Sequence, residues 1–600
     1  MEKRSGRLLV AWSLLLVVAS GAASAEDSAA TRSALFGELH IHSSWSYDSY
    51  FLNVRSSPED AYRYNTGHAI KHYGGTWVRA RAPLDFMALT DHAEYLMFGQ
   101  LLNDKNHPLS QTAFGKRFAS KDPVTSRRAF EEMTGKDPSI RPEFPGRSEA
   151  DAAESVWSQY VALAEKYNDP GTFTTFVGYE WTALPQNQNL HRNVIFAGTD
   201  VPAVPFSSVN SSNPEDLWAW MDSARRSGSD VLAIPHNSNL SNGLMFPLQM
   251  WDGTPVDSNY ASQRMRNEPL VEITQIKGTS ETHPALSPND EWANFEILDT
   301  LIAAHDTVGK TEGSYVRNAY LSGLVLESER GFNPYKFGLI GSSDGHNSTS
   351  PVDEDNYTGK MGAMDGTPEL RRGGNAIHPS NASYSASGLT GVWAEENTRA
   401  SIFAALQRKE TFATTGTRIK LRFFAGYDFD AELLSDSNWT DAAYKSGMHM
   451  GGTLQGRGEE MSPSFVVWAL KDPASTWLQR AQIVKGWVDD GEMQEQVFDV
   501  ACSDGVLPDP QSHRCPDNGA SVNIATCDYS KSSGDTEMAV VWQDPDFDAK
   551  LHAFYYVRIL ENPTCRWSTW EANRHGWPLL DNVPATLQER AWSSPIWYAP

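Results

Sequence analysis

Residues 37–48 read GELHIHSSWSYD, in which a short apolar run ends in polar side chains. The run continues upstream to residue 34 and leads directly into His40 and His42. A β-strand projects residues i and i+2 to the same side, so these two imidazoles can face one point. Asp48 follows a few residues later. The stretch therefore predicts a buried strand whose end carries two histidines and a nearby carboxylate.

The same pattern recurs along the chain, with a short apolar run followed by residues of the same polar types. PLDFMALT (83–90) precedes Asp91 and His92, FTTFVGY (173–179) precedes Glu180, VLAIP (231–235) precedes His236, and KFGLIGSS (336–343) precedes Asp344 and His346. RNVIFAG (192–198) after His191 and LVEITQI (270–276) around Glu272 complete the set. Short unbroken apolar runs predict strands that are buried on both faces.

Helical stretches separate several of these runs. Asn213, Pro214 and Glu215 supply the cap, proline and acid of a helix start, and the helix is predicted to reach about Ser227. Residues 290–308 and 398–409 are predicted as further helices. Strands alternating with helices favour a parallel α/β sheet or barrel.

Two segments break the alternation. Residues 99–169 are polar and predicted to be mostly helical, whereas residues 348–396 are rich in Gly, Asn, Ser and Asp. Each follows a strand end that carries candidate ligands, so we expect both to form a cap or rim over that face. Surface insertions without a role are the alternative.

The sequence changes character after residue 426. Runs such as SFVVWAL (464–470) and AFYYVRILEN (553–562) predict antiparallel β-structure over 427–600, in the form of a small sandwich that packs on the first domain. Docking to a polymer or envelope surface is an alternative role for it. The four cysteines lie in this region: Cys502, Cys515, Cys527 and Cys565. Two disulfides are expected, with three pairings open; a four-thiolate zinc site competes, but no C-x-x-C pair is present.

The first 25 residues have the features of a cleaved signal peptide. Lys3, Arg4 and Arg7 precede an apolar run that is too short to span a bilayer comfortably, and small residues end at Ala25. An uncleaved anchor is the weaker alternative. We expect an exported protein, periplasmic or extracellular, without a membrane span in the mature chain.

The charge and the motifs exclude several classes of function. The formal net charge of −25 argues against a nucleic-acid partner, which requires a basic surface. The sequence contains no Gly-rich nucleotide loop. The expected partner is a small-molecule or anionic ester substrate, and the sequence leaves the oligomeric state open.

The residues at the strand ends favour a metal centre. Of sixteen histidines, seven lie at or near predicted strand ends or starts, and six of these remain when His283, in a Pro-rich loop, is set aside. Imidazole nitrogens and carboxylate oxygens are preferred ligands of divalent transition metals. Parallel strands of a barrel bring their carboxyl ends together, so ligands far apart in sequence can converge. Two or three ions are expected, of zinc, manganese or iron.

The ordered motifs GELHIHSSWSYD, ALTDH, GYEWT, HRNVIFAG, IPHNS and IGSSDGH resemble those of the PHP (polymerase and histidinol phosphatase) superfamily. More narrowly, most of the mature chain resembles an exported bacterial branch known as domain of unknown function 3604, including ENPTCRWSTW near the end. The resemblance implies a distorted (β/α)7 barrel over residues 34–426, with the two insertions, beside the β-rich C-terminal region. It also implies metal-dependent hydrolysis, most commonly of phosphoesters.

The resemblance implies a ligand for each motif. His40, His42, Glu180 and Asp344 would hold a first ion. Glu180 would bridge to a second ion, held also by His191 and His236. Asp48, His92 and His346 would hold a third, although many relatives have histidine where this chain has Asp48. The predicted catalytic residues are Glu180, Asp344 and His236.

Five further residues are candidates for supporting roles. Asp91 could orient a ligand ring or cap its strand, and Glu272 could support a ligand from behind. Arg192 and Lys277 could meet an anionic substrate or form ordinary salt bridges, and Asn237 could bind substrate or its own loop. Hydrolysis of a carboxylic ester or amide at the same centre is an alternative function. A non-catalytic, metal-stabilised binding protein is another, but such sites usually lack several ligands.

Overall fold

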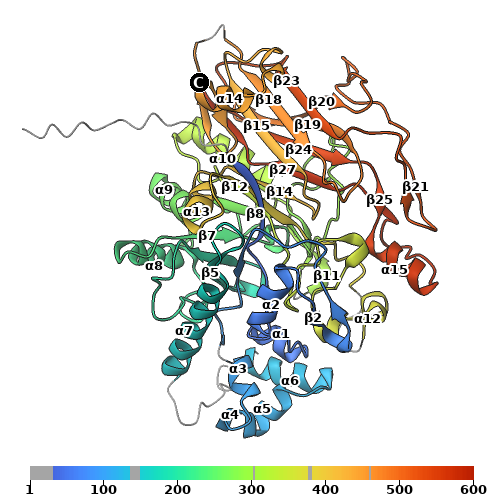
Figure 1. The fold of residues 1–600 in the computed structure, drawn as a ribbon. Coiled ribbons are helices and arrows are strands. Elements are labelled where there is room, and N and C mark those ends of the chain that lie inside the picture. Colours follow the sequence, from blue (N-terminus) through green and yellow to red (C-terminus); the bar gives the residue numbers. More distant parts are fainter. Residues whose placement is uncertain (1–31, 97, 135–148, 302–303, 376–380, 459–460) are drawn as a thin grey trace, which may run out of the picture.

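The computed structural model describes residues 32–96, 98–134, 149–301, 304–375, 381–458 and 461–600. The predicted signal peptide, residues 1–25, lies outside the described residues. The fold is a mixed α/β arrangement around a large central sheet (Figure 1). Among the described residues, no helix combines the length and the apolar character needed to cross a membrane.

The central sheet has 13 strands within the described part of the chain. Its path is β17 (Thr453–Gln455), β28 (Ile596–Ala599), β24 (Ala553–Glu561), β27 (Arg590–Ser593), β14 (Thr411–Thr414), β13 (Leu389–Ala394), β1 (Ser33–Glu38), β4 (Phe86–Leu89), β5 (Thr174–Trp181), β6 (Arg192–Phe196) and β7 (Val231–Pro235). The remaining two strands are β19 (Leu478–Asp489), which pairs with β24, and β20 (Glu492–Cys502), which pairs with β19.

The direction of the strands decides where their ends lie. β1, β4 and β5 run parallel to one another, whereas β6 runs antiparallel to both β5 and β7. A separate sheet joins β8 (Leu270–Gln275) in parallel to β12 (Gly338–Gly341) and antiparallel to β9 (Gly278–Thr279). A parallel bridge between Ile41 and Gly345 connects the segments that follow β1 and β12. The carboxyl ends of β1 and β12 therefore meet.

The strand interiors explain this arrangement. All eight side chains of β5 are buried, as are those of β4, β6, β7, β8 and β12. Strands covered on both faces need apolar residues without alternation, which is the pattern in the sequence. Gly37 in β1 lies against the Phe86 ring so closely that a Cβ atom would come within 2.4 Å of it.

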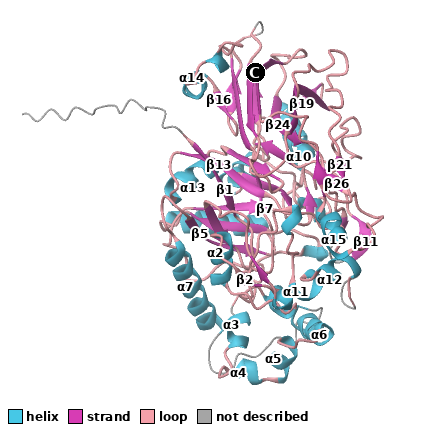
Figure 2. Cartoon of the chain, turned by 45° about the vertical axis from the view of Figure 1, so that its right-hand side comes forward, coloured by secondary structure: helices cyan, strands magenta, loops and turns pink. Residues whose placement is uncertain are grey.

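Helices surround the strands. They are α1 (Tyr47–Phe51), α2 (Pro58–Asn65), α3 (Phe98–Asn103), α4 (Pro108–Gln111), α5 (Ala113–Phe118), α6 (Pro123–Thr134), α7 (Glu149–Tyr167), α8 (Pro214–Arg226), α9 (Ser258–Asn267), α10 (Val316–Arg330), α11 (Gly362–Asp365), α12 (Pro368–Gly373), α13 (Arg399–Gln407), α14 (Trp439–Ser446) and α15 (Trp567–His575). In two views α3 to α6 gather at the end of the molecule opposite β19 and β24 (Figures 1 and 2). The helix predicted from Asn213 is confirmed as α8, with Asn213 as its N-cap.

The helix predicted over residues 290–308 is wrong. Turns precede residue 300, and β10 (Thr300–Leu301) pairs with β11 (Ala304–Val308) as an antiparallel hairpin. Asp290 forms ion pairs with Arg317 and Arg558, and Phe295 lies under the Arg590 guanidinium. These long-range contacts outweigh a helical spacing of apolar residues, which is a weak local signal. The helix of this region is α10.

The C-terminal region contributes strands both to the central sheet and to a second sheet. β27 pairs with β14, and β24 pairs with β27 and β19. A second sheet contains β16 (Met448–His449), β15 (Lys420–Gly426), β18 (Ser464–Leu470) and β23 (Glu537–Gln543). One apolar cluster holds Phe423 and Val467 of this sheet together with Ile483 and Val557 of the central sheet.

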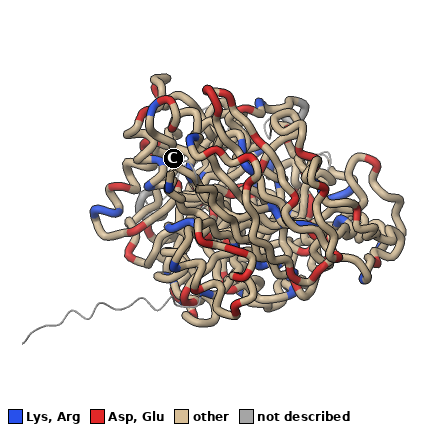
Figure 3. Tube along the Cα trace, turned by 90° about the horizontal axis from the view of Figure 1, so that it is seen from above, with Lys and Arg blue, Asp and Glu red and all other residues tan. Residues whose placement is uncertain are grey.

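Buried ion pairs connect the two regions of the chain. Arg558 on β24 binds Asp290 at 2.7 Å and Glu281 at 3.0 Å, and Arg317 on α10 binds the same two carboxylates at 2.8 Å each. All four side chains are buried. Elsewhere Asp and Glu positions recur around the outline of the molecule (Figure 3), as the net charge of −25 requires.

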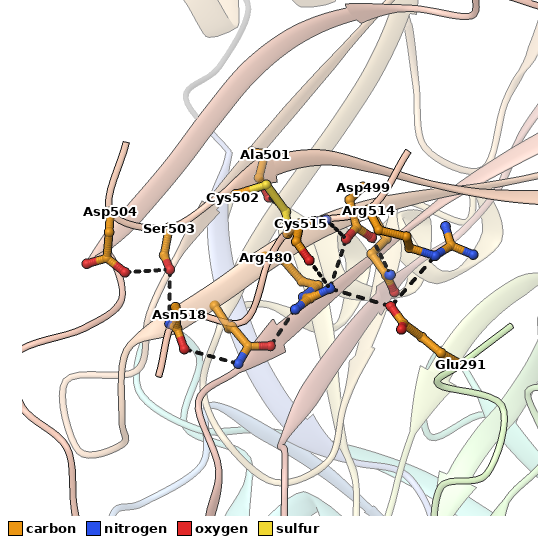
Figure 4. The surroundings of a disulfide bond; sticks show 12 residues. Glu291, Arg480, Asp499, Ala501, Cys502, Ser503, Asp504, Arg514, Cys515 and Asn518 are labelled. Atoms are coloured by element: carbon orange, nitrogen blue, oxygen red, sulfur yellow. Dashed lines mark hydrogen bonds and ion pairs between the residues drawn. A yellow bond between two sulfur atoms is a disulfide. The ribbon is translucent and has the colours of Figure 1, made fainter. Parts of the chain in front are cut away.

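Both predicted disulfides are present, and they pair Cys502 with Cys515 and Cys527 with Cys565. The four-thiolate alternative is thereby excluded. Beside the first disulfide, Asp499 accepts a hydrogen bond from the Cys515 backbone amide and binds Arg480 at 2.9 Å (Figure 4). Arg480, which lies on β19, also forms an ion pair with Glu291. This contact connects the strand beside the disulfide to the segment that precedes β10.

Candidate metal centre

Six strand ends deliver the predicted ligands to one place. His40 follows β1, His92 follows β4, Glu180 is the penultimate residue of β5, His236 follows β7, and Asp344 follows β12. His191 directly precedes β6. Because β6 is antiparallel to β5 and β7, its beginning lies at the same edge as their ends. The reversed strand therefore places His191 beside residues that end parallel strands.

Glu180 stands at the centre of the group, and its two carboxylate oxygens face different histidines. Oε2 lies 3.1 Å from both His42 Nε2 and His92 Nδ1. Oε1 lies 2.7 Å from His191 Nδ1 and 3.2 Å from His236 Nε2. Every one of these side chains is buried. A carboxylate placed between two sets of nitrogens has the arrangement of a bridging ligand.

Asp344 completes the first set of predicted ligands. Its Oδ1 lies 3.4 Å from His40 Nε2 and 3.7 Å from His42 Nε2. The residue has a left-handed backbone with φ +55°, a conformation that costs energy for any residue except glycine. Its backbone amide donates to the His40 carbonyl oxygen at 2.7 Å, which fixes this turn. The aspartate is thus held against the His40 strand end by the backbone itself.

Asp48, His92 and His346 also come together. Asp48 Oδ2 lies 3.2 Å from His92 Nε2 and 3.1 Å from His346 Nε2. The His346 ring stacks on the His42 ring with centroids 3.8 Å apart. Asp48 is the last residue of the first motif, lies on α1 and contacts histidines that follow two other strands. The aspartate in place of histidine therefore still points at the predicted third position.

The donor set fits divalent metal ions. Within the described residues four groups have ligand atoms within 4.8 Å of one another: His42, His92 and His346; His40, His236 and Glu272; His40, His42 and Glu180; and Glu180, His191 and His236. The Nε2 atoms of His40, His42, His92 and His191 are buried without a hydrogen-bond partner in the described chain. Buried nitrogens of this kind are costly unless something binds them.

The protonation states of three predicted ligands suit metal binding. Burial lowers the pKa of His191 to about 4 and that of His236 to about 3. Burial alone would raise the pKa of Glu180, but His92 and His191 hold it well below its usual range. At neutral pH His191 and His236 are neutral and Glu180 is ionised, the forms that ligate metals. At His40 and His92, in contrast, burial is outweighed by nearby carboxylates, which raise the pKa of His40 to about 10 and that of His92 well above its usual value, so a metal bound there would displace protons.

Polar residues behind the ligands fix their orientation. His40 Nδ1 lies 2.9 Å from Glu272 Oε2, on the opposite side of the ring from the Nε2 that faces Glu180. His42 Nδ1 contacts Ser46 Oγ at 2.8 Å, and Ser46 Oγ donates to Asp91 at 2.6 Å. Such partners set the tautomer and aim of a ligating imidazole. Glu272 and Asp91 both stand in this supporting position.

Two lysines flank Asp344. Lys277 Nζ lies 2.6 Å from Asp344 Oδ2, and Lys360 Nζ lies 2.7 Å from Oδ1. Burial raises the pKa of Asp344, but these ammonium groups hold it well below its usual range. Sequence reasoning named Lys277 and missed Lys360 and Gln275, which donates to Asp344 at 3.0 Å. Lys360 lies in the Gly-rich insertion, where no strand pattern marks it.

Two other predicted residues directly follow ligands in the sequence, Arg192 after His191 and Asn237 after His236. Arg192 Nε binds Glu268 at 2.8 Å in a fully buried ion pair, and its NH1 donates to the Leu190 carbonyl. Asn237 is buried with a left-handed backbone at φ +50°. Within the described chain its side-chain amide has no hydrogen-bond partner. Arg192 therefore has a structural ion pair, and Asn237 shapes the loop that follows His236.

A cavity of about 480 Å³ opens onto the centre. Its polar lining includes Asp48, Glu180, His191, Lys277, Asp344 and Lys360. The cavity is large enough for a small organic molecule to reach the predicted ligands.

A family model described as "Protein of unknown function (DUF3604)" matches residues 29–600. No curated protein matches the sequence. One similar solved structure is a two-domain protein from Bacteroides vulgatus containing a predicted PHP-like metal-dependent phosphoesterase. It is 10% identical, the match covers 88% of this chain and 90% of that one, and the TM-score is 0.29.

Proposed function

The chain belongs to the DUF3604 family, and on that premise we propose that it is an exported metal-dependent hydrolase of phosphoesters. One observation carries the proposal: the two oxygens of Glu180 face two separate sets of buried histidine nitrogens. A carboxylate that faces two sets of imidazoles in this way is placed to be shared by two ions. The predicted barrel over residues 34–426 forms part of this proposal.

The residues present would hold two or three divalent ions. His40, His42, Glu180 and Asp344 fit one position, Glu180, His191 and His236 fit a second, and Asp48, His92 and His346 fit a third. Bound ions of this kind lower the pKa of coordinated water and stabilise the charge that develops during hydrolysis. Zinc, manganese and iron all suit a set of imidazole and carboxylate donors.

The chain's own groups support an anionic substrate. Lys277 and Lys360 line the cavity beside Asp344 and add two cationic groups to its floor. His236 and Glu180 are both buried and lie 3.2 Å apart, a separation that suits two ligands of one ion. Export is supported by the pairing of all four cysteines, because disulfides persist in oxidising compartments.

The test combines metal analysis with turnover on the purified mature protein. We expect two or three bound ions per chain and chelator-sensitive hydrolysis of p-nitrophenyl phosphate or bis-p-nitrophenyl phosphate. Glu180→Gln should abolish turnover, whereas Glu59→Gln, at an exposed salt bridge, should keep it. Turnover of carboxylic esters alone would assign a different bond, and bound ions without any turnover would favour a binding protein. A protein that binds no ions would overturn the proposal.

A further inference from the structure

We infer that the cavity selects phosphoesters whose organic group is apolar and about the size of an aromatic ring. This inference rests on the proposed function and adds the substrate class. It follows from the division of the cavity into a charged floor and an apolar wall, which neither the family description nor the ligand set specifies. The floor consists of Lys277, Lys360 and six of the predicted ligands, which are Asp48, His92, Glu180, His191, Asp344 and His346.

One wall is aromatic and is built by two helices far apart in sequence. Phe51 on α1 stacks on Phe130 on α6, with ring centroids 4.2 Å apart. The Tyr47 ring packs on both Phe130 and His92, with centroid separations of 5.8 Å and 5.1 Å. All four residues line the cavity. The aromatic surface therefore extends continuously from a predicted metal ligand toward the cavity mouth.

Aliphatic side chains extend this wall, and the polar residues that line the cavity outside the floor are Arg127, Glu131, Thr182, Asn189, Thr300, Ser383 and Tyr384. Met361 and Met364 come from the segment around α11, and Leu52, Leu184 and Leu298 come from three other loops. Met361 is buried and packs in the same apolar cluster as Phe51. Methionine adapts its shape to ring faces and edges. The wall thus offers contacts to an apolar group from several sides.

This distribution of charge and apolar surface fixes the orientation of a ligand. With the proposed ions bound, a phosphoryl group is matched by the floor, where Lys277 and Lys360 also lie. Its organic group then points along the wall of Phe51, Phe130 and Met364. A sugar or another polyhydroxyl group placed there would lose hydrogen bonds to water that these side chains cannot replace. An apolar ring would gain from leaving water.

Non-hydrolysable probes separate binding from turnover. We would titrate phenylphosphonate and methylphosphonate into the metal-loaded protein by calorimetry. The two probes share the phosphonate and differ in the apolar group. Burying a ring in an apolar pocket should make phenylphosphonate bind about tenfold more tightly or better. Equal affinities, or no binding of either probe, would overturn the inference.

Variants in two parts of the apolar wall test where the preference for phenylphosphonate arises. Phe130→Ala and Met364→Ser should each weaken phenylphosphonate at least about threefold and leave methylphosphonate unchanged within error. Phe114→Ala is the matched control, because Phe114 packs on Phe98 and Phe118 in the same helical insertion but does not line the cavity. If the control lost as much affinity as Phe130→Ala, the preference would come from the fold of the insertion, and the inference would be wrong.

The outcomes distinguish this inference from the proposed function. Hydrolysis of p-nitrophenyl phosphate combined with equal binding of both phosphonates would keep the hydrolase and reject the apolar wall. A preference for phenylphosphonate without turnover of any ester would keep the wall and reject the hydrolase.

Discussion

His40 lies among three carboxylates: its Nδ1 is 2.9 Å from Glu272, and its Nε2 faces Glu180 and Asp344. Glu272 lies in the interior of β8, on a different sheet from the β1 strand end that carries His40. The pair therefore connects the two sheets at the floor of the cavity. It also fixes the nitrogen that His40 presents to the centre, because a proton on Nδ1 leaves the Nε2 lone pair free.

Glu272→Gln should weaken metal binding without removing a predicted ligand. The amide can orient His40 only in part and does not raise the basicity of the ring, so we expect a 10- to 100-fold loss of metal affinity. Competition with a chromophoric chelator measures this. Glu492→Gln, an exposed carboxylate on β20, serves as the control. Unchanged metal affinity in Glu272→Gln would contradict the role given to this pair.

His40→Ala and Asp344→Ala should each lose bound metal and at least about 100-fold of turnover, because both remove a donor from the first position. The fold should persist, since both side chains lie at strand ends and not in the apolar cores. Mass spectrometry of bound metal, activity and circular dichroism on the same samples check this. Full activity with normal metal content in either variant would make the site assignment wrong.

Glu561 should make the protein less stable as the pH rises. Burial raises its pKa to about 8 in the folded state, from about 4.3 in an unfolded chain. Its stabilising contribution is therefore complete below the unfolded pKa and is lost as the pH rises through the folded value. Glu561→Gln keeps an acceptor for Ser475 and should flatten this decline. Thermal midpoints from pH 5 to pH 9 measure it, and parallel curves for variant and wild type would contradict it.

Removing the Cys527–Cys565 disulfide should destabilise the protein more than removing Cys502–Cys515. The two bonds close loops with sequence separations of 38 and 13 residues. Loop-closure entropy predicts contributions of about 4 and about 3 kcal/mol. Paired Cys→Ser variants, compared by thermal unfolding under non-reducing conditions, test the order. The reverse order would show that local packing, such as the Arg480 contacts beside Cys515, dominates.

Arg558→Ala should cost about 3–5 kcal/mol, because it leaves the buried Asp290 and Glu281 carboxylates without part of their compensation. Lys166→Ala, at the exposed pair with Glu59, should cost less than about 1 kcal/mol. Chemical denaturation of both variants provides the comparison. Similar losses would mean that water reaches the Arg558 cluster and screens its charges.

The residues predicted as ligands lie close together in the structure, and they could be named from the sequence because buried strands with polar residues at their ends leave a strong pattern. His191 was harder, since it precedes an antiparallel strand, and only the topology shows that its beginning lies beside the other strand ends. Lys360 carries no pattern, because a loop and not a strand positions it. Its position depends on contacts with Asp344 and His346, which belong to the preceding strand-end motif and not to the loop itself.

The helix predicted over residues 290–308 failed for a related reason. Local spacing was outweighed by Asp290 and Phe295, which reach Arg558 and Arg590 hundreds of residues away. The family membership predicted from the motifs was confirmed by the family model. The sequence also indicated a change near residue 426, from strands alternating with helices to antiparallel β-structure. Pairing of β14 with β27 nevertheless makes the sheet continuous across this position. Strand pairing between distant segments is not visible in either strand alone.

The β14–β27 pairing has a practical meaning for anyone who wishes to express the two halves separately. A fragment ending at residue 426 would carry β14 with its Thr411–Thr414 backbone groups unpaired on one side. An open edge of this kind recruits strands from neighbouring molecules and leads to aggregation. We therefore expect the fragment that carries the candidate metal centre to aggregate on its own, because the β-rich half supplies the strand that covers the edge of β14.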